Sequence, residues 1–163
     1  MARATTSTPH RFDSLQQEVF LNLWRTYDRL KQIEDEVFGQ EEISAQQYNA
    51  LRLLRVVHPN TLQTLELARR LISRAPDITR LIDRLEQRGL LERERKSENR
   101  RVVEVRIGVA GIELLDRIHA AVQACHQRQL GHMSESALHQ LAQLLRRARR
   151  PHEDSSCLSF LDK

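Results

Sequence analysis

The order of patterns in residues 64–111 constrains this chain most: two short helical patterns meet at a tight turn, and two β-prone runs follow. The first helical pattern covers residues 64–71. The second begins near residues 73–76 and ends at Gly89, and its apolar positions recur three and four residues apart, as on one face of a helix. Those positions are Ile78, Leu81, Ile82 and Leu85.

The start of the second helix carries residues typical of helix N-termini. Ser73 can accept a hydrogen bond from a free backbone N–H group, and Pro76 falls in the first turn, where its missing N–H costs little. Asp77 suits the positive end of the helix dipole. We therefore expect this helix to begin between Ser73 and Pro76.

The two β-prone runs, residues 90–95 and 102–107, surround the polar residues 96–101. Such a pattern predicts a two-stranded hairpin. A helix, a turn, a second helix and a hairpin follow each other in the winged helix-turn-helix fold, whose second helix enters the major groove of DNA. The expected fold class is therefore mainly α, with a small β-hairpin wing on the helix-turn-helix lobe and further helices outside it.

The outward-pointing residues of this segment suit contact with DNA. Arg80 can donate two hydrogen bonds to guanine in the major groove, and Thr79 can reach a phosphate or a base. At the hairpin tip, Lys96, Arg100 and Arg101 can enter the adjacent minor groove. The full set of predicted DNA contacts is Ser73, Arg74, Pro76, Asp77, Thr79, Arg80, Arg84, Arg95, Lys96, Arg100 and Arg101.

Positive charge is concentrated in the same segment. The whole chain has a formal net charge of +4, whereas the stretch from Arg69 to Arg106 holds 12 Arg or Lys and 7 Asp or Glu residues. A local excess of this kind favours binding to a polyanion. It is also compatible with a solvated face on which Arg84 or Arg88 simply pairs with neighbouring carboxylates.

Helical patterns also precede this segment. Apolar residues recur at helical spacing over residues 12–37, and Gly39 is expected to end that helix. Ser44 and Gln47 form a capping-box pattern for the next helix, which Pro59 stops.

Two more helices are expected after Gly111. Gly131 separates them, and Ser134 is placed to cap the second. The first carries an apolar stripe near heptad spacing, made of Leu115, Ile118, Val122 and Cys125.

The helices outside the DNA-binding segment have broad apolar stripes. A second copy of the chain would cover these stripes, although they could instead form one monomeric core. The sequence thus predicts an N-terminal dimerisation helix at residues 10–40, a DNA-binding domain at 44–107 and C-terminal dimerisation helices at 108–163.

The remaining features exclude several classes of protein. The apolar stretches cover only a few residues, so no membrane span is expected, and residues 1–9 lack the apolar core of a secretory signal, so a cytoplasmic location is expected. The spacing of Cys125 and Cys157 matches neither a disulfide framework nor a zinc motif, and no metal or cofactor is expected. The sequence has no nucleophile elbow, phosphate-binding glycine loop or metalloprotease motif, so an enzyme is not expected.

Four stretches share one resemblance: Glu66-Leu67-Ala68, residues 78–90, Asn99-Arg100-Arg101, and Gly111. Together they look like the signature of the MarR family, the multiple-antibiotic-resistance-type regulators of bacteria and archaea. The resemblance covers most of the chain, because the flanking helices also fit. It implies a homodimer that binds double-stranded DNA at a palindromic operator, usually as a repressor. It also implies that a small phenolic or lipophilic effector, or thiol oxidation, usually relieves binding.

Two departures from the family pattern concern the wing and the helix caps. Arg101 matches the arginine that reaches the minor groove in the family, but Asn99 stands where the family has an acid. Asp83 could still pair with Arg101. Gln63 and Gly108 stand where the family often has Thr at helix starts, so both caps are expected to be weaker or shifted.

The resemblance also implies an effector pocket between the dimerisation helices and the DNA-binding lobe. Its candidate residues are Trp24, Tyr27, His58 and His119. Cys125 and Cys157 are the candidates for oxidant sensing, which needs an exposed thiol of lowered pKa; His126 and nearby arginines could lower the pKa of Cys125. Two alternatives stay open: a thiol-based redox-sensing regulator of the same fold, and a winged-helix protein-interaction module that does not read DNA.

Overall fold

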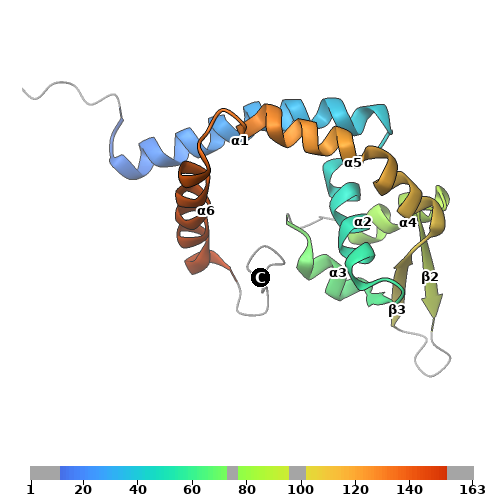
Figure 1. Ribbon diagram of the computed structural model, residues 1–163. Coiled ribbons are helices and arrows are strands. Elements are labelled where there is room, and N and C mark those ends of the chain that lie inside the picture. Colours follow the sequence, from blue (N-terminus) through green and yellow to red (C-terminus); the bar gives the residue numbers. More distant parts are fainter. Residues whose placement is uncertain (1–11, 73–76, 96–101, 154–163) are drawn as a thin grey trace, which may run out of the picture.

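The computed structural model describes residues 12–72, 77–95 and 102–153. Within them, six α-helices and a short 3-10 helix accompany one small antiparallel sheet (Figure 1). The elements are α1 (Leu15–Gln40), α2 (Ala45–Val57), β1 (Leu62–Gln63), α3 (Thr64–Arg70), α4 (Ile78–Gln87), β2 (Leu91–Arg95), β3 (Val103–Ile107), α5 (Val109–Leu130), α6 (Glu135–Arg149) and η1 (Arg150–His152). The fold class expected from the sequence, mainly α with a small β wing, is confirmed.

The end of α1 differs from the expectation. Gly39 lies inside the helix, so the prediction that it ends the helix is wrong. The chain turns instead at Glu42, whose φ of 54° places it in the left-handed region. The N–H of Ile43 donates to the carbonyl of Phe38 at 3.1 Å, which closes the turn as helix ends commonly do.

The start of α2 has the capping box that the sequence predicts. The hydroxyl of Ser44 accepts a hydrogen bond from the N–H of Gln47 at 3.2 Å, and the side chain of Gln47 accepts one from the N–H of Ser44 at 2.9 Å. The helix then enters the core. Its buried residues are Ala50, Leu51, Leu53 and Leu54.

The wing strands β2 and β3 form the predicted hairpin, with Leu91 opposite Ile107. A third strand, β1, pairs with the other edge of β3 and gives the order β1-β3-β2. The sequence patterns do not indicate β1, because a strand of two residues is too short to show alternation. This strand ties the segment just before α3 to the wing.

The helices α5 and α6 carry further outcomes. The sequence predicts that this helix begins after Gly111. In the structure α5 begins at Val109, so Gly111 lies within the helix. Every residue of the predicted stripe is buried: Leu115, Ile118, Val122 and Cys125. Gly131 ends α5 as expected, and the hydroxyl of Ser134 caps α6 by accepting the N–H of Ala137 at 3.3 Å.

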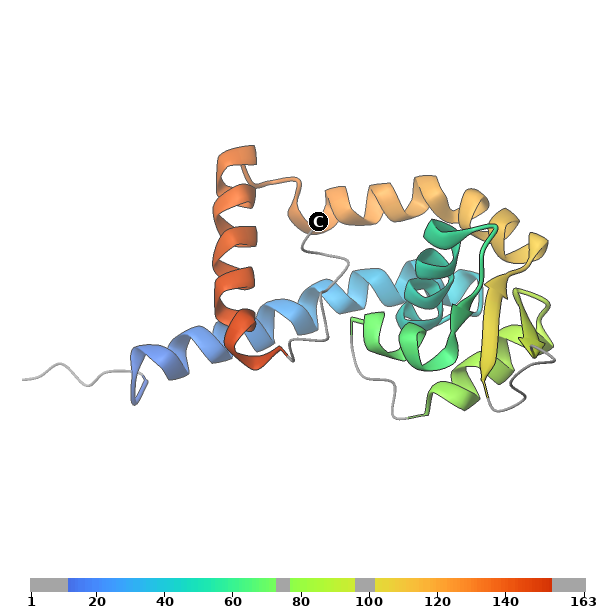
Figure 2. The same cartoon turned by 90° about the horizontal axis from the view of Figure 1, so that it is seen from below.

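The hydrophobic core lies in a lobe formed by the C-terminal part of α1, helices α2 to α5 and the sheet. The N-terminal part of α1 and the whole of α6 extend away from this lobe (Figure 1, Figure 2). Phe38 is the buried residue of α1, and no residue of α6 is buried within the chain. None of the described helices is both long and apolar enough to cross a lipid bilayer.

Candidate nucleic-acid interface

The second helix of the helix-turn-helix, α4, has one buried face and one exposed face, as predicted. Its buried residues are Leu81, Ile82 and Leu85. On the opposite face Thr79, Arg80 and Arg84 are exposed, and 72% of the Arg80 side chain is accessible. This exposure leaves the face open to a ligand of the size and charge of a DNA duplex.

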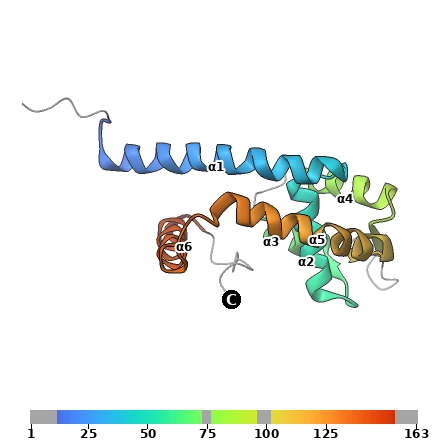
Figure 3. The ribbon, with the colours of Figure 1, turned by 45° about the horizontal axis from the view of Figure 1, so that its top comes forward.

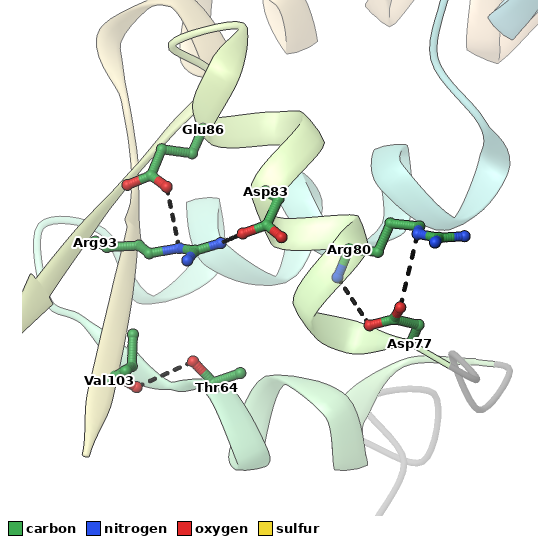
Figure 4. Close-up of polar contacts among 7 residues, drawn as sticks. All are labelled: Thr64, Asp77, Arg80, Asp83, Glu86, Arg93 and Val103. Atoms are coloured by element: carbon green, nitrogen blue, oxygen red, sulfur yellow. Dashed lines mark hydrogen bonds and ion pairs between the residues drawn. The ribbon is translucent and has the colours of Figure 1, made fainter. Parts of the chain in front are cut away.

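The N-terminus of α4 is capped by Asp77. Its Oδ1 accepts the N–H of Arg80 at 2.9 Å, and its Oδ2 lies 3.7 Å from Nε of the same arginine (Figure 4). The helix begins at Ile78, so the predicted start between Ser73 and Pro76 is wrong. A carboxylate both accepts the free N–H group and complements the helix dipole, and it therefore outcompetes a hydroxyl placed earlier. Ser73, Arg74 and Pro76 lie outside the described residues.

The preceding helix, α3, is fixed to the wing by its first residue. Thr64 Oγ1 donates to the carbonyl of Val103 on β3 at 3.0 Å (Figure 4). Gln63 and Gly108, where the sequence suggested weak caps, make no side-chain capping hydrogen bond. The contact through Thr64 holds α3 in place although its cap is weak.

Arg93 on β2 joins the wing to α4. Its guanidinium bonds to the carboxylate of Asp83, and its Nε lies 3.2 Å from Oε2 of Glu86 (Figure 4). Only 26% of the Arg93 side chain is exposed. Sequence reasoning missed this residue and offered Arg101, which lies outside the described residues, as a partner of Asp83. The signal in the sequence is the pair Asp83 and Glu86, two acids three positions apart on one face of the helix, whose mutual repulsion a nearby cation would relieve.

The outer face of the wing carries a cross-strand ion pair. Arg106 on β3 bonds to Glu92 on β2, with Nη2 at 2.6 Å and Nε at 2.9 Å from Oε2. Arg95 is the last residue of β2 and pairs with Val103 in the strand register. Of the wing residues predicted to contact DNA, Lys96, Arg100 and Arg101 lie outside the described residues.

The surface between α3, α4 and the wing is concave. A hollow of about 350 Å³ lies there. It is lined by Gln63, Thr64, Leu65, Thr79, Ile82, Arg93, Val102 and Val103. Thr79 therefore connects the exposed face of α4 to the side of this hollow, so the helix and the wing present one continuous surface.

The predicted effector residues fall in different places. Tyr27 lines a hollow of about 480 Å³ between α1, α2 and α5. His119 lines a neighbouring hollow, and the two share Tyr48, Arg52 and His126. Trp24 is 61% exposed on the projecting part of α1, and His58 follows the last turn of α2. The structure thus brings Tyr27 and His119 toward common neighbours and leaves Trp24 apart from them.

The first of these hollows brings several titratable side chains together. Burial raises the pKa of the Glu34 carboxyl and of the Tyr48 phenol. The Arg52 guanidinium lies 5.8 Å from the centre of the Tyr48 ring, within the range of a cation–π contact. Aromatic faces, a cation and a carboxyl therefore converge on one cavity.

Cys125 does not meet the conditions proposed for oxidant sensing. Its side chain is 4% exposed, and burial together with the nearby carboxylate of Glu34 raises the pKa of the thiol. A reactive thiol needs the opposite shift and access to solvent, so the suggested lowering of its pKa is wrong. Cys157, the other candidate, lies outside the described residues.

Solved structures with the same fold are numerous. The chain is 61% identical to a MarR transcription factor from Planctomyces limnophilus, with a TM-score of 0.67 over 83% of this chain and 98% of that one. A cysteine-to-serine variant of MarR from E. coli in complex with operator DNA gives 22% identity and a TM-score of 0.73 over 83% and 99% of the two chains. BpsR from Bordetella bronchiseptica, described with a mechanism for regulation of its DNA binding by 6-hydroxynicotinic acid, gives 21% identity and a TM-score of 0.73 over 80% and 98%.

The family comparison agrees with the structures. Residues 43–103 match the sequence model of the MarR family. This range contains α2, α3, α4 and β2, and it ends at the first residue of β3. No match is found among curated proteins. The exposed face of α4 and the adjoining wing fit this family, and the 61% identity to a solved relative shows it: the chain belongs to the MarR family of DNA-binding transcription regulators.

Proposed function

We propose that this protein is a dimeric repressor that recognises a palindromic operator. The observation that carries the proposal is the exposed face of α4, where Thr79, Arg80 and Arg84 project beside the wing. In this reading Arg80 contacts base edges, and the wing residues named from the sequence contact the minor groove and phosphates. Repression follows where a bound dimer occupies the site that RNA polymerase needs.

The dimer is supported by apolar surface that the chain leaves uncovered. Exposed large apolar residues gather on the projecting part of α1: Leu15, Val19, Phe20, Leu21, Leu23, Trp24 and Tyr27. On α6, Leu144 is 62% and Leu145 is 37% exposed. We assign residues 10–40 and 108–163 to the contact with a second copy, and residues 44–107 to DNA. A two-fold axis then places the two α4 helices about one helical turn of DNA apart, or a multiple of it.

The hollow between α1, α2 and α5 is the proposed effector site. Tyr27 and Tyr48 offer aromatic faces, while Arg52 and His126 offer polar partners. A small phenolic or lipophilic molecule fits this lining, because its ring can stack and its polar group can be bonded. The regulation of BpsR by 6-hydroxynicotinic acid supports an aromatic effector of this class.

The test uses the full-length protein and a palindromic duplex selected by the protein from a randomised pool. Binding is measured by fluorescence anisotropy at about 50 and about 200 mM salt, a range over which phosphate contacts weaken binding steeply. We expect tight binding by a dimer and a loss of affinity for a scrambled duplex. Equal affinity for both duplexes, or a monomer at micromolar concentration, contradicts the proposal. Addition of simple phenolic acids then tests release from the selected duplex.

A further inference from the structure

The C-terminal ends of α1 and α4 are joined by a single side chain. Arg88, the residue that ends α4, donates from Nη1 to the carbonyl of Glu42 at 2.7 Å and from Nη2 to the carbonyl of Glu41 at 3.0 Å. These acceptors lie 46 and 47 residues away in the sequence, respectively, in the turn that follows α1. Figure 3 shows α4 beside that end of α1. Arg88 is therefore bonded to the backbone of a distant turn and is not simply a solvated charge.

The chemistry of this contact restricts rotation. Backbone carbonyls at the end of a helix carry partial negative charge, so they attract a cation. The planar guanidinium donates from two nitrogens in a fixed fork, which defines an orientation as well as a distance. Because Arg88 is the C-cap residue of α4, a rotation of α4 against α1 would break at least one of the two hydrogen bonds.

The turn that supplies the carbonyls has an unusual conformation. Glu42 adopts φ 54°, which non-glycine residues rarely do. Residues in such conformations are retained where the surrounding structure fixes them. Here the next residue, Ile43, is buried, and the same turn offers both carbonyls to Arg88.

The turn also binds α5. The carboxylate of Glu41 accepts from Nη2 of Arg117 at 2.8 Å, so one residue contacts α5 through its side chain and α4 through its carbonyl. The proposed dimerisation helices α1 and α5 therefore meet the proposed recognition helix at one place. We call residues 41–42 with Arg88 the α1–α4 clasp.

We propose that Arg88 is a specificity-determining positioning residue: through the α1–α4 clasp it sets the spacing of the two operator half-sites that the dimer accepts. The inference rests on the proposed function, since it requires two α4 helices held by α1 of a dimer. Arg88 itself need not touch DNA. A rigid clasp holds the two recognition helices at one separation, whereas an open clasp lets each α4 adjust to its own half-site.

The test measures the dependence of affinity on spacing. The probes are the palindromic duplex that the wild-type protein selects and four derivatives with one or two base pairs added or removed at its centre. Each base pair rotates one half-site against the other by about 35°. We expect the wild type to lose affinity at least about tenfold on a shift of one base pair, and Arg88→Ala to lose about threefold or less on the same shift.

Two further variants separate the clasp from simpler effects. Arg88→Lys keeps the positive charge but loses the fork, so the salt dependence should stay at the wild-type value while the spacing penalty shrinks. Arg128→Ala is the matched control, since Arg128 of α5 bonds to Glu36 of α1 at 2.6 Å, a contact that does not involve α4. Its spacing penalty should equal that of the wild type.

The possible results are distinct. A wild-type protein that shows no preference for any spacing overturns the proposed function itself. If both Arg88 variants are folded and dimeric and still show the full spacing penalty of the wild type, that result overturns the role of Arg88 alone. Should Arg88→Ala fail to fold, the Arg88→Lys profile decides between these outcomes.

Discussion

The guanidinium of Arg93 on β2 bonds to the carboxylate of Asp83 on α4, so a partly buried ion pair joins the wing to α4. Glu86 on the next turn of α4 adds a second carboxylate at 3.2 Å from Nε. Arg93 thus links the two elements that the proposed function places in adjacent DNA grooves.

Replacing Arg93 should loosen that unit. Arg93→Ala leaves two carboxylates facing each other, so we expect the free energy of unfolding to fall by about 1–2 kcal/mol, between the values typical of exposed and buried pairs. Urea unfolding measures this change. Arg106→Ala is the control, because its pair with Glu92 is about half exposed on both sides and should contribute about 0.5 kcal/mol or less. Equal losses in both variants would contradict the importance of the Arg93 contact.

Removal of Arg80 should change sequence reading. The side chain is 72% exposed on the outer face of α4, so Arg80→Ala should fold normally. We expect it to weaken operator binding by about 1–3 kcal/mol and to relax base preference, as loss of a guanine contact does. Selection of duplexes from a random pool by the variant checks this result. Arg101→Ala should lower affinity with less effect on the preference for central bases. An unchanged base preference in Arg80→Ala would contradict the proposal that α4 contacts base edges through Arg80.

Glu42 occupies a position that favours glycine. At φ 54° an L side chain is strained, and glycine relieves the strain at some cost in chain entropy. Glu42→Gly should therefore raise the free energy of unfolding by about 0.5–1 kcal/mol. Thermal unfolding compares it with Glu42→Ala, which removes the same carboxylate but keeps the strain. A stabilisation shared by both variants would show that charge, and not backbone conformation, is responsible.

Two glycines should respond to alanine in opposite ways. A Cβ on Gly111 would lie 2.2 Å from the carbonyl oxygen of Leu90 and 2.9 Å from a side-chain carbon of Ile107, so Gly111→Ala forces backbone apart and should destabilise by about 1–3 kcal/mol. A Cβ on Gly39 would meet nothing within 4 Å, and Gly39→Ala should stabilise α1 by about 0.5–1 kcal/mol. Denaturant midpoints of the two variants should move in opposite directions.

Two glutamates should give opposite dependences on pH. Burial raises the pKa of Glu34, so the folded state holds its proton more firmly than the unfolded state, and the stability associated with this group falls as pH rises through the raised pKa. The hydrogen bond from Arg117 lowers the pKa of Glu41, so its contribution is present at neutral pH and is lost as pH falls through the lowered pKa.

The corresponding variants separate these two effects. Above the raised pKa of Glu34, Glu34→Gln should be more stable than the wild type, and the difference should vanish in acid. Glu41→Gln should be less stable than the wild type at neutral pH, with a difference that also vanishes in acid. Unfolding curves between pH 3 and 8 test both expectations, and the same sign for the two variants at neutral pH would contradict the assignment.

Local signals explain what the sequence predicts well. The buried face of α4, the capping box of Ser44 with Gln47, and the stripe along α5 each depend on residues a few positions apart. The start of α4 was misplaced because Ser73 and Asp77 are both acceptable caps, and their competition depends on the structure of the turn between α3 and α4.

Contacts between distant segments explain what the sequence does not predict. β1 exists only because β3 lies beside it, and Arg93 finds its carboxylates only where β2 crosses α4. The contact of Arg88 with the carbonyls of residues 41 and 42 cannot be predicted from the residue types at those positions, since every residue has a backbone carbonyl. Pairing of this kind requires the tertiary arrangement.

None of the 15 residues of α6 is buried within its own chain. A helix of that length standing alone in water is marginally stable, so another surface must keep it wound. In the proposed assembly that surface belongs to a neighbour, and the order of α6 then depends on how much protein is present. Dilution that separates the two copies is therefore expected to unwind α6 first, because the lobe keeps a hydrophobic core of its own. The helical content of the protein would then depend on its concentration in the cell.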